Sequence, residues 1–244
     1  MILKLADFKK RLEYSLCQQF PSEDDVREFC ERALSAGVGV VCVNPVNVAL
    51  ASKIVGGTDM ELSSNVGFPF GSHRTEVKVL ETRLSVEDGA TQIDMVIDVG
   101  ALRSGNDAHV EEDIGAVVEA AEGRTVKTII ETWVLTDEEK SRACRIAERA
   151  GAGLVKTTTG VRTQYLLQVT DEPRGAVLED VVLMRKVLSP HMRIKASGGI
   201  YMLDFALRLM RAGADQLGVS RGDELASEFS RRFGDGVDLD TLSA

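Results

Sequence analysis

The chain has 244 residues, of which 44% are hydrophobic, and carries a formal net charge of -9. This length suits one α/β barrel, and the excess of 38 acidic over 29 basic residues argues against nucleic acid or an acidic membrane as a partner. No apolar run approaches the roughly 20 residues that span a bilayer, and the N-terminal segment lacks the pattern of a secretory signal. We therefore expect a cytoplasmic protein in which residues 1–244 form one domain.

Cysteine and histidine spacing gives no sign of a metal site. The four cysteines form no CxxC pair, and the three histidines show no HExxH spacing. We interpret the cysteines as reduced thiols, mostly small core residues. The sequence therefore predicts no catalytic metal.

Short β-branched segments alternate with longer segments of helical spacing along the chain. The first unit is the weakest: a short strand at 12–16, then a helix at 22–36 that starts after Pro21. Seven clearer strands follow at 38–45, 62–71, 92–100, 125–132, 153–160, 193–199 and 215–220. Their helices are expected at 46–55, 74–88, 107–122, 137–150, 177–188, 201–212 and 222–232.

Two of these helices have specific signals. Apolar residues at helical spacing, Val77, Leu80 and Leu84, indicate the helix at 74–88, and Thr136 with Glu139 forms a capping-box pattern for the helix at 137–150. Alternating strands and helices imply parallel strands joined by crossovers. Eight such units favour an α/β fold of the (β/α)8 TIM-barrel type, with a doubly wound open sheet as the alternative.

Three of the expected strands carry charged residues in apolar surroundings. Asp94 lies between Ile93 and Met95, Lys156 ends a strand before a run of threonines, and Lys195 precedes Ala196. Ionised groups inside parallel strands are costly unless they are paired or functional. Because barrel enzymes place reactive groups at the carboxyl ends of strands, these three residues are candidate catalytic residues.

Two lysines and a carboxylate at a barrel mouth suggest amine chemistry. A lysine attacks a carbonyl only when it is unprotonated, and a neighbouring positive charge such as Lys195 favours that form in Lys156. Asp94 would move the protons that imine formation requires. Lys127 is expected to face the interior as a pairing partner, and Glu131 to join the same network.

Glycine-rich turns after the late strands suggest a phosphate site. The segments KASGGI (195–200) and GVSRG (218–222) each precede a helix, and TTTG (157–160) adds hydroxyl groups. Backbone N–H groups at helix N-termini bind anions, and barrels commonly hold phosphate at the loops after strands seven and eight. Each turn alone is a weak signal, but together they favour a phosphorylated substrate.

These motifs resemble one family. The segments VCVNP (41–45), VGFPFG (66–71), IDMVIDVG (93–100), KTIIET (127–132), GAGLVKTTTG (151–160), IKASGGI (194–200) and the GVSRG turn are similar to deoxyribose-phosphate aldolases and fall in the same order. The resemblance implies a barrel without metal or organic cofactor. It also implies reversible cleavage of 2-deoxy-D-ribose 5-phosphate to acetaldehyde and D-glyceraldehyde 3-phosphate.

The resemblance implies a role for each matching residue. Lys156 would form the Schiff base, Lys195 would tune it, and Asp94 would relay protons. The positions that match phosphate- or substrate-binding residues are Gly160, Gly198, Gly199, Ser220, Arg221 and Cys42. Cys42 is better explained as a buried strand thiol, and the alternative for Arg221 is that it points to solvent or pairs with Asp223 or Glu224.

Three departures from the family leave alternatives open. Glu13-Tyr14-Ser15 stands where many members have Asp-His-Thr, Arg221 follows the phosphate-turn serine, and the loop at 161–176 is longer than usual. A related Schiff-base aldolase acting on another phosphorylated sugar or aldehyde is one alternative. A barrel that binds a sugar phosphate without turnover is the other. A homo-oligomer, in the first instance a dimer, is expected.

Overall fold

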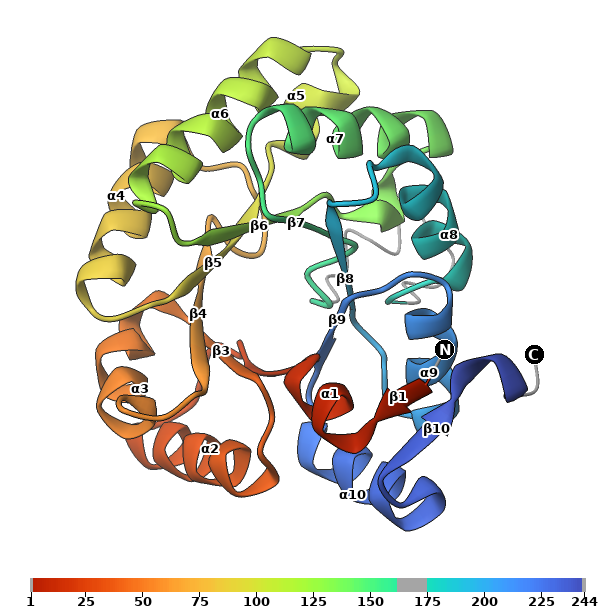
Figure 1. Cartoon of the computed structure of the whole chain (residues 1–244). Coiled ribbons are helices and arrows are strands. Elements are labelled where there is room, and N and C mark those ends of the chain that lie inside the picture. Colours follow the sequence, from red (N-terminus) through yellow and green to blue (C-terminus); the bar gives the residue numbers. More distant parts are fainter. Residues whose placement is uncertain (1, 162–174, 243–244) are drawn as a thin grey trace.

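Eight parallel strands form a closed barrel in the computed structural model, which describes residues 2–161 and 175–242. The strands follow one another around the ring in chain order, and the last pairs with the first (Figure 1). Their bounds are β2 Leu12–Leu16, β3 Val40–Val43, β4 Glu61–Val66, β5 Gln92–Val96, β6 Thr125–Ile129, β7 Leu154–Lys156, β8 Arg193–Ser197 and β9 Gln216–Val219. Closure confirms the (β/α)8 barrel, including its first unit, and excludes the open sheet.

The long helices lie outside the ring of strands, as the alternation predicted (Figure 1). Their bounds are α2 Glu23–Ala36, α3 Val48–Val55, α4 Thr75–Glu87, α6 Asp107–Ala120, α7 Asp137–Arg149, α8 Leu178–Val187, α9 Leu203–Arg211 and α10 Gly222–Phe233. The capping box predicted at Thr136 is confirmed, since its Oγ1 accepts from the Glu139 N–H and the Glu139 carboxylate accepts from the Thr136 N–H. None of the helices in the described ranges could cross a membrane.

Several short elements were not expected from the sequence. They are β1 Ile2–Lys4, α1 Leu5–Lys10, α5 Val99–Arg103, β10 Gly236–Asp238 and the 3₁₀ turns η1 Pro45–Asn47, η2 Thr132–Val134 and η4 Leu239–Thr241. β1 and β10 pair in antiparallel fashion and join the two end segments of the chain. β5 ends before its expected limit because the Asp98 side chain accepts from the Ala101 N–H and starts α5.

Helix α4 lies with its polar side toward the barrel, opposite to the usual arrangement. Val77, Leu80 and Leu84, the residues that predicted this helix, are 49%, 57% and 50% exposed. The buried side chains of the helix are polar: Lys78, Thr82 and Ser85. The helix itself was therefore predicted correctly, whereas its apolar stripe lies on the surface.

The buried polar side chains of α4 are stabilised by specific partners. The Lys78 Nζ lies 2.6 Å from Asp113 Oδ2 and donates to the Val96 carbonyl at 3.0 Å. The Ser85 hydroxyl is 2.8 Å from that of Ser64 in β4. A buried charge is tolerated when it is paired and hydrogen-bonded, so these contacts set the orientation of α4.

Candidate active site

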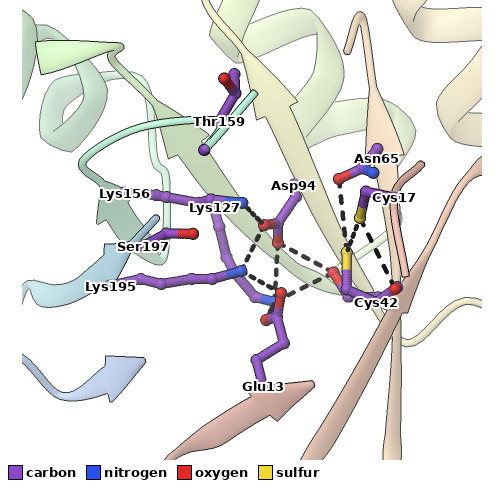
Figure 2. A network of polar contacts seen from close by, with 12 residues as sticks. Glu13, Cys17, Cys42, Asn65, Asp94, Lys127, Lys156, Thr159, Lys195 and Ser197 are labelled. Carbon is purple, nitrogen blue, oxygen red and sulfur yellow. Dashed lines mark hydrogen bonds and ion pairs between the residues drawn. The ribbon is translucent and has the colours of Figure 1, made fainter. Parts of the chain in front are cut away.

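Five charged side chains from five strands meet inside the barrel (Figure 2). They are Glu13 of β2, Asp94 of β5, Lys127 of β6, Lys156 of β7 and Lys195 of β8. Lys156 is 4% exposed and the other four are fully buried. The structure thus brings together the three residues singled out from the sequence, and it places Lys127 in the interior as expected.

Asp94 contacts all three lysines. Its Oδ2 lies 2.7 Å from the Lys156 Nζ and 2.5 Å from the Lys195 Nζ. Its Oδ1 lies 2.9 Å from the Lys127 Nζ and accepts from the Ser63 hydroxyl at 3.0 Å. Asp94 is therefore close enough to exchange a proton with Lys156, and its orientation is held by the other contacts.

Glu13 is the second carboxylate of the cluster and was not recognised as a site residue from the sequence. Lys127 and Lys195 both donate to it, one to each oxygen. An acid between the buried Leu12 and Tyr14 of a short strand is the signal that the sequence offers for it. The Glu13 carboxylate therefore compensates two of the three buried lysines.

The charges of this cluster do not balance. Three ammonium groups face two carboxylates, and Lys127 and Lys195 each pair with both carboxylates. Among the described residues, the only carboxylate paired with Lys156 is that of Asp94. Loss of one proton would make the cluster neutral, and Lys156 is the least compensated of the three lysines.

The surrounding charges determine the protonation of the cluster. Although burial alone raises the pKa of Asp94, the charges of Lys127, Lys156 and Lys195 outweigh it and hold that pKa well below its usual value. The pKa of Glu13 is lowered in the same way, against burial and repulsion from Asp94. Burial alone would lower the pKa of Lys195, but the negative charges of Asp94 and Glu13 outweigh burial and raise that pKa above its usual value. Lys195 therefore remains a cation beside Lys156.

A cavity of about 420 Å³ opens beside Lys156. The site residues that line it include Lys156 itself and the predicted phosphate-binding residues Gly160, Gly198, Gly199 and Ser220. Asp94 and Lys195 are fully buried behind Lys156. A small molecule in this cavity would thus meet one amine from the cluster and the glycine-rich turns together.

The glycine turns pack backbone against backbone at the cavity wall. Gly198 has a φ of 94°, and a Cβ there would lie 2.9 Å from the Thr158 Oγ1 and 3.2 Å from the Gly160 Cα. The Thr158 hydroxyl also donates to the Ser197 carbonyl at 2.9 Å. Because a side chain at Gly198 would be both strained and crowded, glycine is needed to bring the two turns together.

Two of the predicted binding residues do not line the cavity. Cys42 is fully buried, and its Sγ donates to the Asn65 Oδ1 at 3.5 Å. The Arg221 Nη1 lies 3.4 Å from the Glu224 Oε2, and its guanidinium is 5.9 Å from the centre of the Tyr201 ring. A contact of Arg221 with phosphate therefore requires another rotamer and stays a prediction. Of the loop at 161–176, residues 162–174 lie outside the described residues.

Glu13, Cys42 and Asp94 offer ligand atoms within 4.8 Å of one another. Both carboxylates are already paired with ammonium groups. Three ammonium groups around the same oxygens would repel a cation, so the donor set suits lysines better than a metal.

Glu131 lies two residues after β6 and directly before η2, in the left-handed region with a φ of 55°, and is turned toward the loop after β7. Its Oε2 accepts from the Thr159 N–H at 3.2 Å, and its buried Oε1 has no partner among the described residues. Burial raises the pKa of Glu131 to about 6, against the hydrogen bonds from Thr159 and the charge of Lys156. Glu131 thus positions the Thr159 turn rather than contacting Lys127.

The raised pKa of Glu131 predicts a pH-dependent stability change. A shift from 4.5 to about 6 destabilises the ionised folded protein by about 2 kcal/mol, and this cost appears as pH rises through that interval. Glu131→Gln cannot ionise. We expect its free energy of unfolding, relative to wild type, to increase by about 2 kcal/mol between about pH 4 and about pH 7.

Urea unfolding at the two pH values measures this difference. Glu138→Gln, an exposed residue of α7, controls for the general loss of one negative charge. If the difference in free energy of unfolding between Glu131→Gln and wild type stayed constant with pH, ionisation of Glu131 would not destabilise the folded protein.

The closed barrel, the buried lysine–carboxylate cluster and the adjoining cavity together define a barrel enzyme that acts on a small molecule. The chain belongs to the DeoC/LacD family of aldolases, whose sequence model matches residues 6–225. The resemblance seen in the sequence motifs is thereby confirmed, and the protein is an aldolase, a carbon–carbon lyase.

Individual relatives agree with this assignment. Deoxyribose-phosphate aldolase of Geobacillus sp. is 44% identical over 214 residues, covering 87% of this chain and 92% of the relative. The Thermococcus gammatolerans deoxyribose-phosphate aldolase is 43% identical over 220 residues, or 88% of this chain and 93% of the relative. Among solved structures, the tetrameric deoxyribose phosphate aldolase of Aeropyrum pernix superposes with a TM-score of 0.82 at 30% identity, covering 93% of this chain and 92% of that chain.

Proposed function

We propose that this aldolase reversibly cleaves 2-deoxy-D-ribose 5-phosphate to acetaldehyde and D-glyceraldehyde 3-phosphate through a Schiff base on Lys156. The observation that carries the proposal is the position of Lys156, the least compensated amine of the cluster and the one that lines the cavity. The names of the relatives support the substrate.

The contacts of Lys156 suggest how each step proceeds. The unprotonated amine adds to the C1 aldehyde, and Asp94, directly or through a water, moves the protons as water leaves and the imine forms. The C3 hydroxyl then loses its proton, the C2–C3 bond breaks, and its electrons enter the imine to give an enamine. Protonation of the enamine carbon and hydrolysis release acetaldehyde and restore the amine.

Turnover and chemical trapping together test this function. We expect the purified protein to release D-glyceraldehyde 3-phosphate from 2-deoxyribose 5-phosphate, and borohydride with acetaldehyde to inactivate it by adding one reduced adduct. If the protein preferred other phosphorylated aldehydes to 2-deoxyribose 5-phosphate, the alternative of a related Schiff-base aldolase with another substrate would be favoured, since Glu13 and Arg221 depart from the family pattern. Absence of both turnover and trapping would leave only a sugar-phosphate-binding barrel.

We propose that the phosphate binds to the turns formed by Gly160, Gly198, Gly199 and Ser220, with Arg221 swinging onto it. The backbone N–H groups of these turns supply neutral donors, and a guanidinium adds a charge-assisted bond. Arg221→Ala should raise KM for 2-deoxyribose 5-phosphate by roughly 10- to 100-fold, because such a bond contributes about 1.5–3 kcal/mol. Unphosphorylated 2-deoxyribose should be turned over as before, and an equal effect on both sugars would contradict the assignment.

We also propose that the protein works in the cytoplasm as one domain and as a homo-oligomer, with a dimer as the first form to test. The apolar stripe of Val77, Leu80 and Leu84 on α4 offers a surface for a second copy, and the Aeropyrum pernix neighbour is a tetramer. We expect Leu80→Glu to shift the mass measured by light scattering toward the monomer. Val182→Glu, at an exposed apolar position of α8, should not do so; an unchanged mass in Leu80→Glu would exclude this surface.

A further inference from the structure

Two cysteine side chains touch at the edge of the active site. Cys17 directly follows β2 and Cys42 lies in β3, and their Sγ atoms are 4.0 Å apart (Figure 2). The Cys17 thiol also lies 3.9 Å from the Cys42 carbonyl oxygen. The aldolase chemistry proposed above uses neither thiol.

Only one of these thiols can be reached from the cavity. Cys17 is partly exposed and lines the cavity together with Lys156, whereas Cys42 is fully buried behind it. The other two cysteines, Cys30 and Cys144, are buried in α2 and α7. An oxidant that enters the cavity therefore meets Cys17 first and finds Cys42 in contact with it.

The surroundings give the two thiols different reactivities. The hydrogen bond with Cys42, helped by the charge of Lys156, lowers the pKa of Cys17 in spite of burial. The hydrogen bond with Cys17 and burial raise the pKa of Cys42 well above its usual value. Because the thiolate is the form that reacts with oxidants, Cys17 is the thiol suited to be oxidised first, and the contact between the two sulfur atoms places Cys42 beside it as the second thiol.

We propose that Cys17 and Cys42 form a reversible disulfide when the protein meets a peroxide, and that this disulfide lowers turnover. The Cys17 thiolate attacks one peroxide oxygen, giving a sulfenic acid and hydroxide. The Cys42 sulfur then attacks the Cys17 sulfur, the S–O bond breaks, and hydroxide leaves as water with the Cys42 proton. The hydroxide from the first step takes up the proton that Cys17 released when it formed its thiolate, so the two thiols lose two electrons in total and the peroxide is reduced to two waters.

The loss of turnover follows from the place of the disulfide and depends on the proposed function. The sulfur atoms must approach from 4.0 Å to about 2.05 Å, so Cys17 moves toward β3. Cys17, Gln18 and Phe20 line the cavity, and their segment would move with it. The Cys42 sulfur also lies within 4.8 Å of the Glu13 and Asp94 oxygens, so its movement would disturb the partners of the lysines.

Peptide mapping after a mild dose of hydrogen peroxide tests the disulfide without reference to activity. We expect a Cys17–Cys42 cross-linked peptide, with Cys30 and Cys144 still reduced. Turnover of 2-deoxyribose 5-phosphate should fall at least about fivefold and recover with dithiothreitol, since disulfide formation is reversible. Oxidation of Cys17 without the cross-link, or a cross-link with unchanged turnover, would overturn the proposal.

Variants separate this pair from general oxidation. Cys17→Ser should leave Cys42 reduced at the same peroxide dose and protect turnover relative to its own untreated value, and Cys144→Ser should still form the cross-link. If peroxide no longer lowered the turnover of Cys144→Ser, the assignment to Cys17 and Cys42 would be contradicted. Failure of the proposed function would appear separately, as absence of turnover in the reduced protein, while the peptide map would still report on the disulfide.

Discussion

Replacing Lys156 with methionine should abolish turnover of 2-deoxyribose 5-phosphate, with a loss on the order of 10⁴-fold or more, as expected for a covalent nucleophile. Methionine fills a similar volume without an amine, so the barrel should still fold. Removal of the Lys156 amine leaves the ammonium groups of Lys127 and Lys195 facing two carboxylates, so the charges of the cluster balance. The measurement is turnover together with the melting temperature of the variant.

Mapping of the trapped adduct identifies the nucleophile independently of this variant. Borohydride reduction of wild type with acetaldehyde should label the peptide that contains Lys156. Lys127 and Lys195 serve as internal controls, because each is fully buried and paired with both carboxylates. A label on either of them would refute the assignment of Lys156.

The second large effect is expected at Asp94, where Asp94→Asn should lower turnover by about 10²–10⁴-fold, as typical for a general acid–base group. The amide cannot accept the Lys156 proton as a carboxylate does. It also leaves three buried ammonium groups facing Glu13 alone, so the free energy of unfolding should fall by about 3–5 kcal/mol. Turnover and urea unfolding measure the two effects.

Glu13→Gln is the matched comparison for Asp94. Glu13 contacts Lys127 and Lys195, whereas the ion pair of Lys156 within the described ranges is with Asp94. We expect a similar loss of stability but a smaller loss of turnover, since the partner of Lys156 remains in place.

A folded Asp94→Asn variant with wild-type turnover would show that Asp94 is a structural residue only.

The fold and three residues of the site were predictable from local sequence patterns. Alternating strand and helix segments indicated eight parallel units, and parallel strands bring their carboxyl ends to one edge of the barrel. Asp94, Lys156 and Lys195 were noticeable because charge is costly in apolar strands. The side-by-side register of Lys156 and Lys195 on β7 and β8 agrees with the expected pairing.

Other features depended on the tertiary structure alone. Periodicity showed that α4 has one apolar face, but the ion pair of Lys78 with Asp113 decided that this face lies outside. Likewise, no local pattern around Cys17 indicates that its thiol touches that of Cys42, 25 residues away. Both outcomes depend on partners contributed by other elements.

The sequence by itself determined the barrel and marked Lys156, Lys195 and Asp94 as candidate catalytic residues. The tertiary structure decided that Glu13 belongs with them and that Lys156 is the amine beside the cavity. The physical reason is that sequence patterns reflect each segment's own preferences, whereas charge compensation depends on which side chains converge. Glu13 and Lys195 are 182 positions apart, and closure of the barrel between β9 and β2 brings their strands into the same ring.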